Sequence, residues 1–337
     1  MISVAALTSS QNDPSSRFRI RQFIPRLKAL GVNAVEFCPW ISKYAPAMLQ
    51  LTGLGLASRF CAVLAARKFD VTWLNRELIS GRDTLECYAG RRLLFDVDDA
   101  IWLSGRAGFS QRIAARSAGV IAGNRAIADY FRPHAPRVWL VPTSVDTEIW
   151  RPSCISQQQP WTIGWSGTSW NLKYLYGIEE PLCAFLDGHK DAKLLVICDR
   201  LPAFRRLEPD HWSFMRWSRE NEVLGVQRMN VGLMPLANTE WTRAKCGLKL
   251  LCYLSVGLPA VVSPVGVAAE MLRHGSAATG LAATTKQEWR EHLEALYRDR
   301  ALAKSMGNAG RIMVQDRYSC ERSAKLLAGI FEDVAAS

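Results

Sequence analysis

The sequence predicts an α/β protein with two doubly wound parallel-sheet domains that face each other across a cleft. Short apolar runs alternate with segments of helical apolar spacing along most of the chain. The alternation stops at the polar stretch Arg151–Pro160, which contains two prolines, and then starts again. With 337 residues, the chain is long enough for two hydrophobic cores.

Residues 1–155 are expected to form the N-terminal domain. Its strands are predicted at Ser3–Leu7, Asn33–Phe37, Val71–Leu74, Leu93–Phe95, Gly119–Ala122 and Val138–Val141, and its helices at Arg17–Leu30, Leu56–Lys68, Arg112–Ala118 and Ala126–Phe131. The uncharged stretch Tyr44–Ser58 is too short and too broken to cross a bilayer, and it fits a core helix better than an interfacial helix.

Residues 156–318 are expected to form the second domain. Its strands are predicted at Trp161–Trp165, Lys193–Cys198, Val231–Leu236 and Ala260–Ser263, and its helices at Leu172–Leu186, Ala244–Val256, Lys286–Arg298 and Arg300–Val314. Gly257 stands where a left-handed residue commonly ends a helix, with Pro259 beyond it. For residues 319–337 we expect a C-terminal helix that crosses back onto the N-terminal domain.

The net charge of +11 is shared unevenly, with +8 in the residues up to Ile155 and +3 in the remainder. No helix-turn-helix, zinc-finger or RNA-binding signature accompanies the basic half, so we do not expect a nucleic-acid partner. An anionic membrane surface or a phosphate-bearing substrate explains the charge equally well.

The nine cysteines are scattered and never form a CxxC pair, which favours reduced thiols in a cytoplasmic protein. The N-terminus MISVAALTSS lacks the basic leader of a signal peptide. We therefore expect a cytoplasmic protein. If its basic half binds an anionic membrane, the protein would be peripheral at the inner face of the plasma membrane.

A basic cluster opens the predicted helix Ala244–Val256. Arg243, Lys245 and Lys249 crowd its first turns, and the two lysines share a face because they are four residues apart. Cations at this end oppose the helix dipole, and a bound diphosphate would resolve the conflict. The alternative interpretation is a solvated basic turn. We favour the anion site because ligands bind at the carboxyl ends of parallel strands.

The chain resembles the group 1 (family four) retaining glycosyltransferases, in particular their bacterial polysaccharide-type members. The resemblance rests on SSRFRIRQFIPRLKALGV, RRLLFDVDDAIW, VIAGNRAIADYF, VWLVPTSVDTEIWRP, TIGWSGTSWNLKYL and KCGLKLLCYLSVGLPAVVSPVG, and it covers nearly the whole chain. It implies the GT-B fold of two Rossmann-like domains, with the acceptor on the N-terminal side and a nucleotide sugar on the C-terminal side. It also implies transfer with retention to a glycan or lipid-linked acceptor, in polysaccharide or glycoconjugate synthesis.

The resemblance assigns a set of donor-binding residues. Besides the basic cluster, these are Gly164, Ser166, Gly167 and Thr168 of the turn GWSGT, Lys173 beyond it, Cys252, Gly266, Val267 and Glu270. Small residues in this turn let backbone N–H groups approach a phosphate. The same residues also fit an ordinary turn between a strand and a helix that binds no ligand. The family often has two glutamates in the donor helix, and these fall on Ala244 and Cys252. The lysine three residues before the second glutamate is retained as Lys249.

Asp98 and Asp99 are the candidate catalytic residues, which would orient or deprotonate an acceptor hydroxyl. We expect no metal and no cofactor, because two-domain glycosyltransferases of this kind neutralise the diphosphate with Lys, Arg and helix termini. Asp96 is interpreted as structural. Arg17, Arg19 and Arg21 are candidates to hold an acceptor phosphate, or are solvated.

Two alternatives to a transferase remain. A nucleotide-sugar epimerase of the same fold would need a carboxylate or histidine constellation, and the five histidines show no cluster in the sequence. A non-catalytic glycan-binding or scaffold protein is suggested by the loss of the paired glutamates at Ala244 and Cys252.

Overall fold

The computed structural model describes residues 1–41, 43, 53–90, 92–153, 160–273 and 278–337, which form two compact units. Unit 1 contains Met1–Ser144, Arg243–Cys246 and Cys320–Ser337, and unit 2 contains Val145–Thr242 and Gly247–Ser319. The first change of unit therefore falls after residue 144, earlier than the predicted limit at 155. Most of the predicted linker and of the uncharged stretch 44–58 lies outside the described residues.

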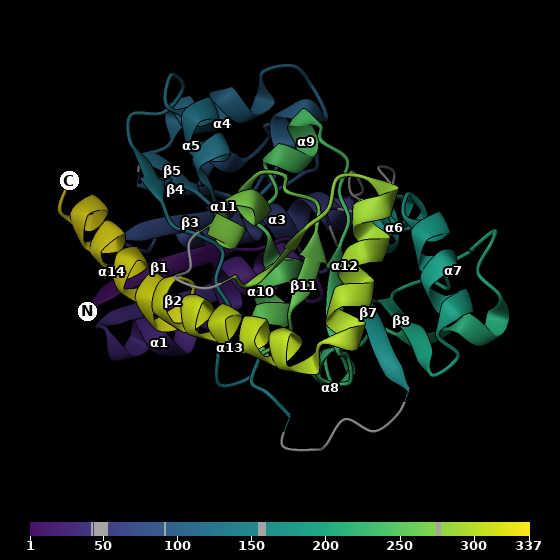
Figure 1. Ribbon diagram of the computed structural model, residues 1–337. Coiled ribbons are helices and arrows are strands. Elements are labelled where there is room, and N and C mark those ends of the chain that lie inside the picture. The colour runs from purple at the N-terminus through teal and green to yellow at the C-terminus, as the bar shows by residue number, and fades with distance from the viewer. Residues whose placement is uncertain (42, 44–52, 91, 154–159, 274–277) are drawn as a thin grey trace. The chain divides into compact units, whose positions relative to one another are not determined.

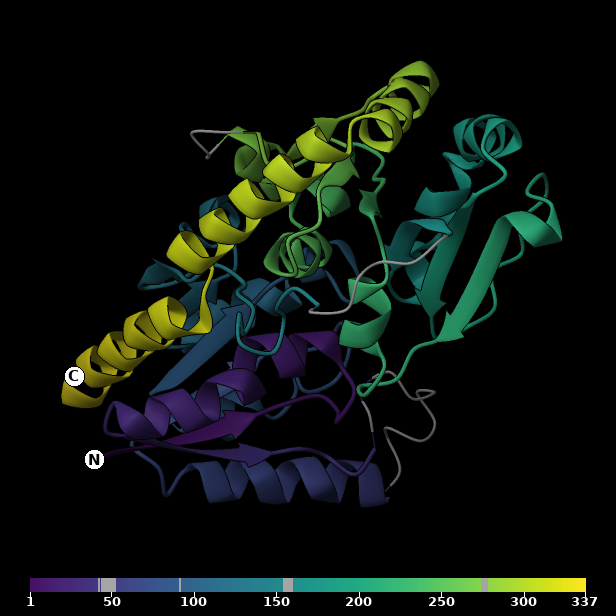
Figure 2. The same ribbon diagram turned by 60° about the horizontal axis from the view of Figure 1, so that its bottom comes forward.

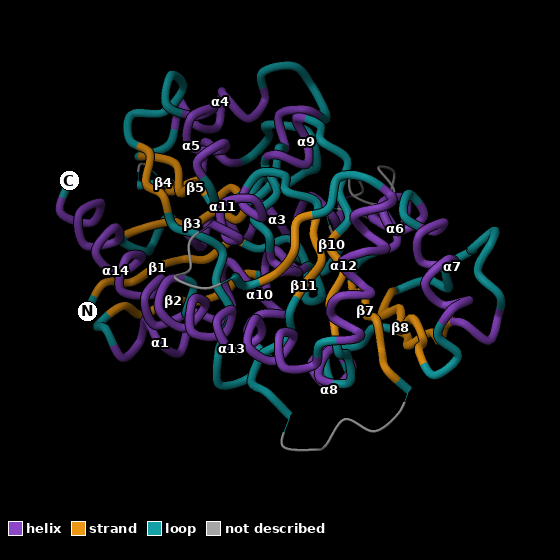
Figure 3. The backbone as a smooth tube through the Cα atoms, viewed as in Figure 1, coloured by secondary structure: helices purple, strands orange, loops and turns teal. Residues whose placement is uncertain are grey.

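Unit 1 has a six-stranded sheet in the order β2-β1-β3-β4-β5-β6, and all neighbouring strands are parallel (Figures 1 and 3). The strands are β1 (Ile2–Leu7), β2 (Val32–Phe37), β3 (Val71–Asn75), β4 (Leu93–Val97), β5 (Gly119–Ala122) and β6 (Val138–Leu140). Strands β3, β4 and β5 are buried along their whole length, as expected for parallel strands with both faces covered.

Helices cover both faces of this sheet. They are α1 (Ile24–Ala29), α3 (Gly53–Ala66), α4 (Phe109–Arg116), α5 (Arg125–Phe131) and α14 (Cys320–Ala336), with shorter turns η1 (Ser16–Ile20), η2 (Arg21–Phe23), η3 (Glu86–Tyr88) and η4 (Ile101–Leu103). Figure 2 shows α1 and α3 on opposite sides of β1 and β2. Helix α14 packs beside α1, with Leu327 and Phe331 in the same core as Val4 and Trp73.

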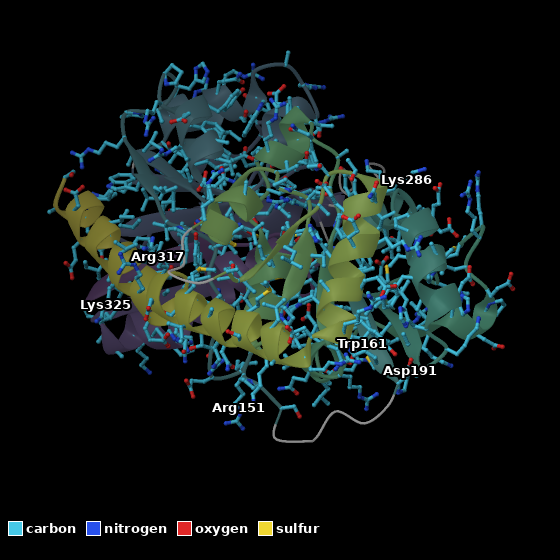
Figure 4. All side chains as sticks on the ribbon, in the orientation of Figure 1. Arg151, Trp161, Asp191, Lys286, Arg317 and Lys325 are labelled. Atoms are coloured by element: carbon cyan, nitrogen blue, oxygen red, sulfur yellow. The ribbon has the colours of Figure 1, made fainter. Side chains whose placement is uncertain are left out.

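Unit 2 has a second parallel sheet, in the order β12-β11-β10-β7-β8-β9. Its strands are β7 (Trp161–Ser166), β8 (Ala192–Cys198), β9 (Trp212–Arg216), β10 (Val231–Met234), β11 (Ala260–Val262) and β12 (Gly280–Ala282). Figure 4 labels Trp161 and Asp191 where β7 and β8 begin, and the Trp161 N–H donates to the Asp191 carbonyl at 2.8 Å. The opposite, carboxyl ends of these strands are where a ligand is expected.

The helices of the second half are α6 (Leu172–Tyr176), α7 (Glu179–Gly188), α8 (Glu222–Gln227), α9 (Glu240–Arg243), α10 (Leu248–Ser255), α11 (Val267–Arg273), α12 (Lys286–Arg298) and α13 (Arg300–Arg317), with turns η5 (Ser169–Asn171) and η6 (Pro209–His211). The predicted end of a helix at Gly257 is confirmed: this glycine has φ +77°, and its N–H donates to the Leu254 carbonyl.

Two predicted helices are interrupted. Arg17–Leu30 is divided into η1, η2 and α1, and Leu172–Leu186 is divided into α6 and α7. Pro25 and Pro181 lie in the first turns of α1 and α7, and neither has an N–H to continue a hydrogen-bonded turn from the preceding segment. Three further elements, β9, α8 and β12, were not predicted. Strands β9 and β12 are the edges of their sheet and have no fully buried apolar run, and α8 has only six residues. Among the described residues, no helix has the length and apolar content needed to span a bilayer.

A buried ion pair lies in the core of unit 1. Arg19 is 1% exposed and Asp96 is 0% exposed. The Arg19 Nε donates to Asp96 Oδ1 at 2.8 Å and its Nη2 to Oδ2 at 3.1 Å, while Nη1 donates to the Val141 carbonyl at 2.7 Å. The expectation that Arg19 binds an acceptor phosphate or is solvated is therefore wrong, because η1 turns its side chain into the core.

We predict that Arg19→Met destabilises the protein strongly, because Asp96 would remain buried without its partner. The expected loss in free energy of unfolding is about 3–5 kcal/mol, measured by urea denaturation. The exposed Arg125 on α5 provides the control, and Arg125→Met should change stability by no more than about 0.5 kcal/mol. Equal effects of the two substitutions would contradict the structural role of Arg19.

Candidate functional site

In unit 1 the strand order reverses at β1, which has β2 on one side and β3 on the other. Open α/β sheets bind ligands at the carboxyl ends of strands at such a point. Hydrogen-bonded polar side chains gather there. Asn75 Nδ2, at the end of β3, donates to Ser15 Oγ at 2.9 Å, and Ser15 Oγ donates to Asp98 Oδ1 at 2.8 Å.

Asp98 and Asp99 follow β4 at the same edge and are held by Arg76. The Arg76 Nε donates to Asp98 Oδ1 at 2.5 Å, and its Nη2 lies 3.7 Å from Asp99 Oδ2. Arg76 has φ +56°, and no other non-glycine residue in the described ranges has a positive φ. Backbone strain of this kind gathers at functional sites, so Arg76 joins the candidates although no pattern in the sequence marks it.

The two aspartates have different proton affinities. Burial alone would raise the pKa of Asp98, but the Arg76 guanidinium, Arg19 and the Ser15 hydroxyl together hold that pKa below its ordinary value. Burial raises the pKa of Asp99, and Lys245 and Arg76 offset this only in part. Asp98 is therefore a fixed anion, while Asp99 is the carboxylate with the higher affinity for a proton.

Unit 1 also includes the four-residue segment Arg243–Cys246. The Asn124 Nδ2 donates to the Ala244 carbonyl at 2.7 Å, and the buried Cys246 thiol donates to the Asp98 carbonyl at 3.3 Å. Lys245 Nζ lies 3.8 Å from Asp99 Oδ2. Burial and the nearby Asp98 raise the pKa of Cys246 to about 12, so this thiol stays protonated.

The predicted start of the donor helix is corrected by this segment. Helix α10 begins at Leu248, because Gly247 adopts the left-handed φ of +70°. Arg243 ends α9 and Lys245 lies between the helices, so only Lys249 stands in the first turn of α10. Of the three basic residues, only Lys249 therefore opposes the dipole of α10, a conflict that a bound anion would relieve.

We predict that Asn124→Ser loosens the segment Arg243–Cys246 and leaves α5 folded. Asn124 caps α5 through its side-chain oxygen, and serine is a comparable cap, but serine lacks the amide that binds the Ala244 carbonyl. Trypsin cleaves after Arg243 and Lys245, so cleavage there should become several-fold faster than in the wild type. Unchanged cleavage, read by mass spectrometry, would show that the amide does not hold the segment.

In unit 2 the strand order reverses at β7, which lies between β8 and β10. Tyr253 of α10 joins the carboxyl ends of β7 and β10. Its hydroxyl accepts from the Ser166 N–H at 2.9 Å and donates to the Leu233 carbonyl at 3.3 Å. Burial raises the pKa of Tyr253 far above its ordinary range, so the hydroxyl remains a neutral donor.

Lys249 lies at this point of reversal. Its Nζ is 3.9 Å from the centroid of the Trp165 ring, and a Cβ built on Gly167 would lie 2.8 Å from that Nζ. The structure thus brings together Lys249 and Gly167, two residues predicted to bind the donor. Trp165 completes the group, although no pattern in the sequence marks this residue as functional.

Three residues of the predicted phosphate-binding turn are corrected. Gly164 is buried inside β7, where a Cβ would clash with Met229. The N–H of Ser166 is taken by Tyr253, and the N–H of Gly167 donates to the Ile197 carbonyl at 3.0 Å. The N–H groups of Ser166 and Gly167 are therefore engaged inside unit 2, and β7 runs one residue further than predicted.

The remaining predicted donor residues have varied surroundings. Thr168 and Lys173 are exposed, Cys252 is buried on α10, and Gly266, with φ +55°, precedes Val267 and Glu270 at the start of α11.

Of the acceptor-side arginines, Arg21 Nε donates to Glu36 Oε2 at 2.8 Å, and the Arg17 Cζ lies 5.0 Å from the centroid of the Phe18 ring. Their roles stay predictions. In the described ranges, no group of three or more His, Cys, Asp and Glu residues is arranged to hold a metal ion.

Residues 168–299 match the family model described as glycosyl transferases group 1. The sucrose-phosphate synthase of Thermosynechococcus elongatus is similar in structure over 100% of this chain and 100% of its own, with a TM-score of 0.74 and 15% identity. HepE of Anabaena, in complex with UDP and glucose, is similar over 98% of this chain and 100% of its own, with a TM-score of 0.72 and 13% identity.

WaaG, a glycosyltransferase involved in lipopolysaccharide biosynthesis, is similar over 97% of this chain and 100% of its own, with a TM-score of 0.66 and 14% identity. No curated protein matches the chain. At these identities the solved structures show a shared fold, and residues 168–299, less than half of the chain, are similar to the group 1 glycosyltransferases. The predicted fold of two parallel-sheet units is therefore confirmed, and the predicted resemblance to group 1 glycosyltransferases is confirmed for residues 168–299.

Proposed function

We propose that this protein is a glycosyltransferase that transfers a sugar from a nucleoside diphosphate sugar to a glycan or lipid-linked acceptor, in polysaccharide or glycoconjugate synthesis. One observation carries the proposal. Lys249, which belongs to the segment that matches the group 1 glycosyltransferases, lies beside Gly167 at the carboxyl ends of β7 and β10, where a parallel sheet binds its ligand.

On the donor side, Lys249 would bind the diphosphate and stabilise the negative charge that develops as the sugar leaves. HepE of Anabaena forms complexes with UDP and with UDP-glucose, which supports a nucleoside diphosphate donor here. Arg243, Lys245, Lys173 and Glu270 remain candidates for further donor contacts. Transfer with retention, in which the leaving diphosphate takes the acceptor proton, is part of the proposal.

On the acceptor side, Asp98 and Asp99 have different proposed roles. Asp98 already accepts from Ser15 and Arg76, so it suits the orientation of neighbouring groups. Asp99 is held only through longer ion pairs to Arg76 and Lys245, and its raised pKa suits a carboxylate that accepts a hydrogen bond from an acceptor hydroxyl. Peripheral binding of the basic first half to an anionic membrane stays a prediction based on charge.

A thermal-shift screen against UDP-, GDP-, ADP- and TDP-sugars tests the donor assignment. A donor at about 100 times its Kd should stabilise the native state by about 2.7 kcal/mol and raise the melting temperature. Lys249→Ala should weaken binding roughly ten- to hundredfold, because it removes a charged contact to phosphate. The exposed Lys304 on α13 is the matched control. Equal shifts in Lys249→Ala and wild type would exclude Lys249 from the donor site.

Activity should survive treatment with EDTA. In the proposed site the Lys249 ammonium, rather than a divalent ion, stabilises the leaving diphosphate. The measurement is release of the nucleoside diphosphate from the donor found in the screen, with and without chelator. Loss of turnover in EDTA that Mn²⁺ or Mg²⁺ restores would contradict this mechanism and favour metal binding at Asp98 and Asp99.

A further inference from the structure

Trp165 is a buried aromatic residue at the carboxyl end of β7. Its side chain is 0% exposed, and its Nε1 has no hydrogen-bond partner within the part of the chain that the structure describes. A buried N–H without a partner destabilises the folded state, so nothing is gained from the polar atom of this side chain. Any benefit of tryptophan at this position must come from its ring.

The Lys249 ammonium lies over the face of this ring. A distance of 3.9 Å from Nζ to the ring centroid is well inside the range of a cation–π contact, and tryptophan gives the strongest such contact of the aromatic residues. A lysine side chain has a flexible four-carbon stem, so its ammonium needs a fixed partner if it is to meet a ligand in one place. The indole face is one such partner, and it has no charge of its own that would neutralise the ammonium.

Gly167 keeps the space beside this contact open. A Cβ at this position would lie 2.8 Å from the Lys249 Nζ and 3.0 and 3.1 Å from the Trp165 Cη2 and Cζ2. Any larger residue would therefore press on both the ammonium and the ring. The positioning of Lys249 matters for binding, because the N–H groups of Ser166 and Gly167 are engaged within unit 2.

We propose that Trp165 is a positioning residue, whose indole face fixes the Lys249 ammonium beside Gly167 so that it meets the diphosphate of the donor. The identity of the ligand rests on the proposed function. The contact between the ring and the ammonium does not, so the two can fail separately.

The contact is tested first without a ligand. Reductive ¹³C-methylation of the lysines keeps their charge, and Lys249→Arg identifies the resonance of residue 249 by its loss. In the wild-type protein that resonance should be shifted upfield by the ring current of Trp165, and in Trp165→Leu the shift should disappear. An unshifted resonance in the wild type would overturn the proposal.

The role in binding is tested by a double-mutant cycle, with UDP and inorganic pyrophosphate as probes in titration calorimetry. Trp165→Leu should weaken binding about two- to thirtyfold, and Trp165→Phe should recover part of the loss. In the Lys249→Ala background, Trp165→Leu should have no further effect, because Trp165 acts through Lys249. An equal loss in both backgrounds would show a merely structural role and overturn the proposal.

Gly167→Ala gives a second route that leaves Trp165 in place, which matters if Trp165→Leu does not fold. It should weaken UDP binding and move the Lys249 resonance. Gly188→Ala is the matched control, because a Cβ there meets nothing within 4 Å. Unchanged binding in Gly167→Ala would count against the proposal. A wild-type protein that binds none of the nucleoside diphosphates, yet shows the upfield shift, would remove the proposed function and leave the contact itself established.

Discussion

The first strand of each parallel sheet has a neighbour on both sides, and this constraint decides where each unit can hold polar chemistry. Elsewhere along β1 and β7 the side chains are mostly buried, so functional groups can gather only beyond the carboxyl ends. In unit 1 that edge carries Ser15, Asn75 and Asp98. In unit 2 the same edge carries Tyr253 and Lys249, which engage the last residues of β7.

Charged side chains close to a buried sheet edge must be paired with opposite charges, and unit 1 has two ion pairs near the carboxyl end of β4. Arg19 satisfies Asp96 inside the core, and Arg76 satisfies Asp98 just beyond the end of β4. The inner pair contributes rigidity, since its carboxylate also accepts from the Trp73 indole. The outer pair holds Asp98 in one orientation, and its strained Arg76 backbone is tolerated only because the surrounding network fixes it. Asp99 is held more loosely, through longer ion pairs to Arg76 and Lys245.

The sequence predicted the features that local patterns encode. Apolar runs located most strands, and Gly257 located the end of α10. It failed where the deciding partner is distant. In the sequence, Arg19 resembles a surface residue of an amphipathic helix. Its partner Asp96 is 77 positions away, so no local pattern indicates the ion pair. Likewise, the sequence does not show that the N–H groups of Ser166 and Gly167 donate to the Tyr253 hydroxyl and the Ile197 carbonyl, which are also distant in the chain. Trp165 looked like an ordinary core residue for the same reason.

The basic segment around Cys246 shows why charge counted along a sequence is a poor measure of anion affinity. Lys245 lies against Asp99, and this contact offsets its charge, whereas Lys249 lies against the neutral ring of Trp165. A carboxylate partner competes with an incoming phosphate for the same ammonium. An aromatic ring attracts an ammonium group and does not itself cancel the charge. Two lysines four residues apart therefore have different surroundings, since Lys245 contacts a carboxylate and Lys249 contacts an aromatic ring.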